Sequence, residues 1–166
     1  MTLNKLLNTL SAGRVKRWHT SDGATQSVGE HTFGVCVILI YLLSASKLDA
    51  QNQLATLVGG VLHDAPEIYT GDIPAPIRKQ LEDAGAMSLI DATAREKVLA
   101  IDLPDALQRI VFYADKLEAF LFALKTGRDA IAEFNKLEIL KAIDTDTETE
   151  RDVVAMVKSF FERRQN

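Results

Sequence analysis

The sequence has little of several features that mark common protein classes. Its single cysteine, Cys36, excludes an internal disulfide framework and fits a reducing cytosol. Its longest apolar run, from Val35 to Leu43, is too short to span a bilayer, and no signal-peptide pattern stands at the N-terminus. The formal net charge of -4 argues against a duplex nucleic-acid binder. We therefore expect a cytoplasmic protein, bacterial or from an infected cell, that binds neither membranes nor duplex nucleic acid.

Two kinds of catalytic motif are also absent. The chain has no glycine-rich Walker loop, which argues against ATP-driven work. No serine or cysteine stands in a nucleophile motif, and Cys36 lies in an apolar segment that favours a buried, inert side chain. The candidate chemistry must therefore come from other side chains.

Helical periodicity runs through the chain, and the alternation typical of strands is absent. Ser27 and Glu30 have the spacing of a capping box, Pro104 is placed to begin a long helix and Gly127 to end it. A chain of 166 residues that is 47% hydrophobic suits one domain with a full hydrophobic core. Together with the helical periodicity, this predicts a single all-α domain over residues 1–166. The predicted helices are residues 3–10, 27–47, 50–69, 77 onward, 87–100, 104–127, 128–142 and 146–164, with a polar loop at 13–26 and a proline-stiffened loop at 71–76.

Four polar residues stand in segments that otherwise read as apolar core: His31, His63, Asp64 and Asp115. A buried imidazole or carboxylate without a partner costs several kcal/mol, so a bound metal ion is the simplest compensation. Two histidines and two aspartates suit a divalent transition metal, and water on such an ion becomes a nucleophile near neutral pH. Taken singly, each residue is more often an ordinary core or surface group; the combination favours a metal site.

The order and context of these residues resemble a known family. The segments SVGEHT (27–32), HDAPEIYTGDIPAP (63–76) and YADKL (113–117) are similar to the HD-domain metal-dependent phosphohydrolases of the YfbR-type 5′-deoxynucleotidase branch. The resemblance covers about residues 14–125. It implies an HD-fold helical bundle, a metal ion on the two histidines and two aspartates, and attack of water directly on phosphorus.

The resemblance also implies roles for residues around the metal ligands. Glu67 and Asp72 would orient or deprotonate the attacking water, or hold further metal ions on a polyphosphate; the alternative for Asp72 is an ordinary turn residue. Arg17 would clamp phosphate and Trp18 would shape the sugar pocket, against the alternative that Trp18 is core and Arg17 solvated. The remaining candidates, Arg78 and Lys79, would meet a phosphate tail or be plain surface charges.

Several functions remain open at this point. The favoured one is a viral-type dATP triphosphohydrolase giving deoxyadenosine and triphosphate, because the chain is as short as the compact viral members. The alternatives are a deoxynucleoside 5′-monophosphatase and a non-catalytic nucleotide-binding regulator. Co²⁺, Mn²⁺ or Zn²⁺ is the expected ion, with Mg²⁺ as a further alternative.

A homo-oligomer, either a dimer or a ring of dimers, is expected from the C-terminal segment. That segment holds nearly too many apolar positions for one side of a surface helix. They are Val153, Val154, Met156, Val157, Phe160 and Phe161.

Overall fold

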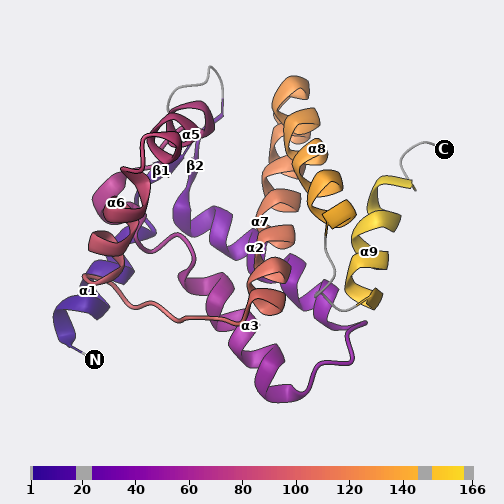
Figure 1. Cartoon of the computed structure of the whole chain (residues 1–166), viewed down its shortest axis with the longest axis horizontal. Coiled ribbons are helices and arrows are strands. Elements are labelled where there is room, and N and C mark those ends of the chain that lie inside the picture. The colour runs from indigo at the N-terminus through magenta and orange to yellow at the C-terminus, as the bar shows by residue number, and fades with distance from the viewer. Residues whose placement is uncertain (1, 18–23, 146–150, 163–166) are drawn as a thin grey trace. The chain divides into compact units, whose positions relative to one another are not determined.

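The computed structural model describes residues 2–17, 24–145 and 151–162 and confirms the all-α class (Figure 1). Its elements are, in chain order, α1 (Leu3–Ala12), β1 (Lys16–Arg17), β2 (Gln26–Ser27), α2 (Val28–Leu43), α3 (Ala50–Leu62), α4 (Glu67–Thr70), α5 (Ala75–Asp83), α6 (Met87–Arg95), α7 (Asp105–Lys125), α8 (Asp129–Thr145) and α9 (Arg151–Glu162). None of the described helices is both long and apolar enough to cross a membrane.

The chain forms two compact units. Unit 1 comprises Met1–Thr32 and Val61–Ile101, and unit 2 comprises Phe33–Gly60 and Asp102–Asn166. Two of the three boundaries therefore fall within α2 and α3, and the third falls in the loop between α6 and α7. The expectation of a single domain over residues 1–166 stays a prediction.

Unit 2 is built on an apolar core. The helices α7 and α8 pack against each other along their length (Figure 1). In α2, Leu39 is fully buried, and a side chain at Gly60 of α3 would overlap it, so glycine permits this close approach. The helix α7 ends at Lys125, and the predicted stop residue Gly127 lies two positions beyond it with a φ of 73°, which suits glycine. Amides of Gly127 and Arg128 donate back to the carbonyls of Leu124 and Ala123, which closes the helix end.

The predicted capping box is confirmed in unit 1. The Ser27 amide and hydroxyl donate to Glu30 Oε2 at 2.7 and 2.8 Å, and the Glu30 amide donates back to Ser27 Oγ at 3.2 Å. These hydrogen bonds lower the pKa of the Glu30 carboxyl. The start of α2 is therefore fixed just before His31.

The predicted irregular loop at 13–26 was wrong in part. The strands β1 and β2 pair antiparallel, with Lys16 opposite Ser27 and Arg17 opposite Gln26. Two residues per strand are too few to show alternation, so no sequence pattern could indicate this ribbon.

The predicted single helix at 50–69 was also wrong, because α3 ends at Leu62 and α4 begins at Glu67. Pro66 has no amide hydrogen to donate to Leu62, whose carbonyl accepts instead from the Ala65 amide at 3.1 Å. The turn at 63–66 thus replaces one turn of helix and carries His63 and Asp64. Two other predicted helices were too long at their C-terminal ends. The helix predicted to reach residue 47 ends at Leu43 (α2), and the helix predicted to reach residue 100 ends at Arg95 (α6).

The C-terminal helix is less exposed than its sequence indicated. In α9, Val153 and Val157 are fully buried, and the Phe161 ring contacts the Phe120 ring of α7 at 5.4 Å between centroids. Half of the apolar surplus that motivated the predicted oligomer is therefore internal to unit 2.

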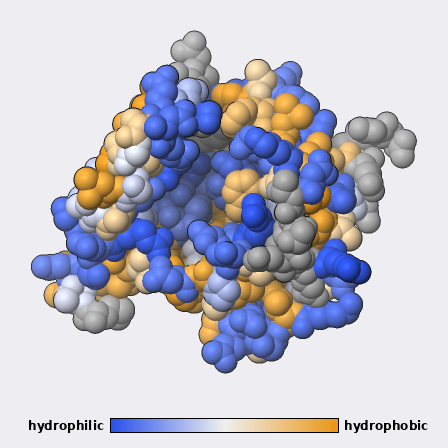
Figure 2. All heavy atoms as spheres, viewed as in Figure 1, coloured by the Kyte–Doolittle hydropathy of each residue, from blue (hydrophilic) through white to orange (hydrophobic). Residues whose placement is uncertain are grey.

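Exposed apolar side chains occur elsewhere in the described residues. Figure 2 shows hydrophobic atoms over α8, where Phe134 and Leu137 are exposed, and hydrophilic atoms over α5. In α1, the leucines at helical spacing are exposed; they are Leu3, Leu6, Leu7 and Leu10.

Candidate metal centre

Three of the four predicted metal ligands come together in unit 1. His31 lies in the first turn of α2 and is completely buried. His63 and Asp64 lie in the turn after α3, and both side chains are less than a fifth exposed. The capping box positions His31 at the start of α2, and the turn that ends at Pro66 places His63 and Asp64 next to it.

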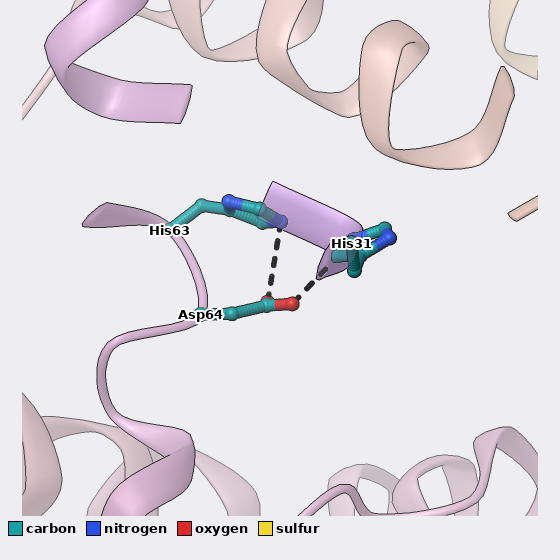
Figure 3. A group of neighbouring side chains, drawn as sticks. All are labelled: His31, His63 and Asp64. Carbon is teal, nitrogen blue, oxygen red and sulfur yellow. Dashed lines mark ion pairs between the residues drawn. The ribbon is translucent and has the colours of Figure 1, made fainter. Parts of the chain in front are cut away.

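The Asp64 carboxylate faces both imidazole rings (Figure 3). Its Oδ1 lies 3.3 Å from His63 Nε2, and its Oδ2 lies 3.6 Å from His31 Nε2. The two rings are 5.4 Å apart between centroids. One donor atom from each residue lies within 4.8 Å of the others.

This donor set fits a divalent ion. Donors that stand 2.0–2.1 Å from a tetrahedral ion lie about 3.3–3.4 Å apart. The two carboxylate–imidazole separations, 3.3 and 3.6 Å, are close to this value, and the whole donor set lies within 4.8 Å. Two imidazoles and a carboxylate also have the right chemistry for zinc, manganese or cobalt. Three protein ligands with further positions open are typical of catalytic rather than structural sites.

Arg17 contacts the same carboxylate. Its Nη1 donates to Asp64 Oδ2 at 2.6 Å, and the two side chains are only 13% and 17% exposed. The β1–β2 ribbon holds Arg17 there, and the Val28 amide donates to the Val15 carbonyl where the ribbon enters α2. This ion pair was not predicted; the sequence analysis assigned Arg17 to phosphate.

Glu67 lies beside this cluster at the start of α4. Burial and the neighbouring Asp64 carboxylate raise the pKa of Glu67 to about 8, Arg17 acts in the opposite direction, and Asp72 adds to the rise. The Oε2 atom of Glu67 is buried without a hydrogen-bond partner. A carboxyl group held near neutrality with an unused oxygen can accept a proton from a water molecule at about pH 7.

Two other predicted site residues pair with carboxylates that do not belong to this cluster, and a third lies outside the description. Arg78 Nη2 pairs with Asp91 at 2.8 Å, and Lys79 pairs with Asp83 at 3.7 Å, so both cations have carboxylate partners on the surface of unit 1. Trp18 lies outside the described residues.

The fourth predicted ligand belongs to the other unit. Asp115 lies on α7 in unit 2, where Lys116 Nζ is 3.7 Å from its carboxylate. Its role as a ligand stays a prediction.

Comparison with known proteins identifies the family. A family profile described as 5′-deoxynucleotidase YfbR-like matches residues 5–111. The chain belongs to this YfbR-like family. The matched region contains His31, His63, Asp64 and Glu67, whereas Asp115 lies just beyond it.

Three relatives of this YfbR-like chain carry two kinds of name. Two are called dATP triphosphohydrolase: one from Acinetobacter phage SH-Ab 15497, 33% identical over 49% of this chain, and one from Salmonella phage PMBT28, 28% identical over 71%. A 5′-deoxynucleotidase from Shewanella oneidensis is 29% identical over 87% of this chain and 79% of its own length. The matches to the two phage proteins span 45% and 65% of those proteins.

A solved structure shares the fold. The cyanophage S-2L HD phosphohydrolase (DatZ), solved with dA and one catalytic Zn²⁺ ion, superimposes with a TM-score of 0.74 at 18% identity. The alignment covers 99% of this chain and 98% of that one. The predicted HD fold is therefore confirmed.

Proposed function

We propose that this protein is a metal-dependent phosphohydrolase of 2′-deoxynucleoside 5′-phosphates. The observation that carries the proposal is the buried cluster of His31, His63 and Asp64 with the Glu67 carboxyl group beside it, whose Oε2 is buried without a hydrogen-bond partner. Family membership supports the same reaction class. A buried carboxyl group with an oxygen free to contact water, beside a candidate metal site, favours catalysis over a non-catalytic regulator, so we place that alternative last.

The substrate we favour is dATP, with deoxyadenosine and triphosphate as products. The names of the two phage relatives support it. The bacterial relative, which matches more of the chain, supports the second candidate, a deoxynucleoside 5′-monophosphatase. Both candidates need the same bond to break between the 5′ oxygen and phosphorus, and they differ in how much phosphate leaves.

The side chains divide the work as follows. His31, His63 and Asp64, with Asp115 as the proposed fourth ligand, would hold a divalent ion, with Zn²⁺, Co²⁺ or Mn²⁺ ahead of Mg²⁺. Such an ion would act as a Lewis acid on a phosphate oxygen and make water more acidic. Glu67 would receive the proton of the attacking water and pass it to the leaving 5′ oxygen. The proposed roles outside the ligand set are water orientation by Asp72, phosphate binding by Arg17, sugar packing by Trp18 and contact with a phosphate tail by Arg78 and Lys79.

One assay separates the candidates. The purified protein, loaded with Co²⁺ or Mn²⁺, is given each deoxynucleoside mono- and triphosphate and the matching ribonucleotides, and the products are separated by chromatography. Release of triphosphate from dATP supports the favoured function, and release of phosphate from monophosphates alone supports the second. Binding of nucleotide with no product from any of them would leave only the regulator.

We also propose a homo-oligomer, either a dimer or a ring of dimers. Three of the six apolar side chains counted in the C-terminal segment are buried within unit 2. The support now comes from α2, where Phe33, Val37 and Ile40 are 73%, 49% and 60% exposed on one helix face. Light scattering at micromolar concentration tests it, and a monomer mass would contradict it.

A further inference from the structure

The ion pair between Arg17 and Asp64 places a fixed positive charge where a metal ion is expected. The guanidinium lies 2.6 Å from Asp64 Oδ2, and this same oxygen lies 3.6 Å from His31 Nε2. An ion about 2 Å from Asp64 Oδ2 would stand at most about 4.7 Å from Arg17 Nη1. Both side chains are more than four-fifths buried, so solvent screens this repulsion weakly.

We propose that Arg17 and the metal ion compete for Asp64, and that a phosphate group relieves the competition by drawing the guanidinium away. Arg17 is then a positioning residue that couples metal binding to phosphate binding. The inference rests on the proposed metal site, but not on the identity of the nucleotide.

The sign of the effect follows from two opposing contributions. Loss of a hydrogen bond that orients a metal ligand weakens metal binding about 10–100-fold. Relief of repulsion between a divalent ion and a guanidinium at this separation is larger, even at an effective dielectric constant of about 20. Repulsion therefore dominates, and removal of the Arg17 charge should tighten metal binding.

A phosphate group can offset the repulsion between the metal ion and the Arg17 guanidinium. The planar guanidinium matches two phosphate oxygens, and a phosphate dianion offsets the charge that the ion and Arg17 place together. Because linkage is reciprocal, phosphate then tightens metal binding by the same factor by which metal tightens phosphate binding. Phosphate can also contact the ion directly, so the part due to Arg17 is the difference between the wild type and a variant.

The test measures Mn²⁺ affinity without any nucleotide. Free Mn²⁺ is followed by electron paramagnetic resonance in titrations of wild type, Arg17→Gln and Arg17→Lys, each with and without inorganic phosphate. Lys16→Gln is the matched control, because Lys16 is exposed on the same strand and its charge acts on Glu30. The metal-induced rise in melting temperature is recorded in parallel.

We expect Arg17→Gln to bind Mn²⁺ at least tenfold more tightly than wild type, with a larger metal-induced rise in melting temperature. Arg17→Lys and Lys16→Gln should stay within about threefold of wild type. Phosphate should tighten Mn²⁺ binding several-fold more in wild type than in Arg17→Gln.

Three results would overturn the inference. They are weaker or unchanged binding in Arg17→Gln, an equal phosphate effect in both proteins, or an Arg17→Lys variant that behaves like Arg17→Gln. If wild type and all variants fail to bind Mn²⁺ or any other divalent ion, the metal centre itself is wrong. Inactivity on every nucleotide, with the coupling present, would overturn the proposed function and leave this inference standing.

Discussion

The two units of this protein are stabilised in different ways. Unit 2 buries many large apolar side chains, among them Leu39, Ile110, Leu117 and Ile139, together with the polar Thr56, Glu118 and Asn135. In unit 1 the buried apolar side chains among the described residues are Ala12, Val28, Ala65, Met87, Ala94 and Val98. Apolar burial contributes about 25 cal/mol per Å², so most of the hydrophobic stabilisation belongs to unit 2.

Unit 1 instead collects costly groups. His31 and the partly buried Asp64, Arg17 and Glu67 lie together there. Burial and the Asp64 charge disfavour the ionised form of Glu67 and raise its pKa to about 8. We infer that unit 2 provides most of the hydrophobic stabilisation. Unit 1 holds a site whose buried charges are compensated when ligands bind. Four substitutions or conditions test this contrast, in order of decreasing effect.

Removal of a ligand should have the largest effect. Asp64→Ala is expected to abolish stoichiometric metal binding and to lower activity by more than about a thousandfold, since metal-ligand loss removes the means of stabilising the transition state. Elemental analysis and product assays measure both. The control Asp144→Ala, an exposed position on α8, should change neither. A metal-loaded, active Asp64→Ala protein would mean that the cluster in unit 1 is not the metal centre.

Neutralisation of Glu67 should act on the chemical step alone. Glu67→Gln is expected to lower kcat by about a hundredfold or more, a typical contribution of a general base, while metal content stays the same. Steady-state kinetics with metal analysis checks it, with the exposed Glu96→Gln as the matched variant. A kcat within about threefold of wild type would make Glu67 structural.

A cavity in unit 2 should destabilise the fold without touching the chemistry. Leu39→Ala removes a fully buried side chain and is expected to cost about 3 kcal/mol of unfolding free energy. Leu10→Ala in α1, where the side chain is 67% exposed, should cost less than about 0.5 kcal/mol. Urea titration measures both. Equal losses at the two positions would mean that α1 is covered in solution.

The metal-free protein should lose stability as the pH rises, because of Glu67. Its folded-state pKa of about 8 is above the ordinary value of 4.5, so the folded protein keeps a proton that the unfolded chain releases. The contribution of Glu67 is therefore complete below pH 4.5 and is lost between pH 4.5 and 8, by at most about 1.4 kcal/mol per pH unit. Urea titrations of wild type and Glu67→Gln in a chelator measure it. A constant difference between the two proteins across this range would contradict the raised pKa.

The sequence by itself determined the helical class, several helix ends and the identity of the central polar residues. Local rules were sufficient for these features. The capping box at Ser27 and the stop at Gly127 depend on hydrogen bonds within a few residues, and the structure confirms both. His31, His63 and Asp64 were conspicuous because polar groups are costly on apolar helices.

Only the tertiary structure decided how these residues meet. The helix predicted over 50–69 breaks before Pro66, and residues 63–66 form a turn. Glu67 therefore lies near the Asp64 carboxylate because of this turn and not because of helical spacing. The contact of Arg17 with Asp64 joins positions 47 residues apart through a ribbon too short to leave a pattern. The leucines of α1 have the spacing of a core face, yet they are exposed. Periodicity reports that side chains share a face, whereas what covers that face depends on segments far away in the chain.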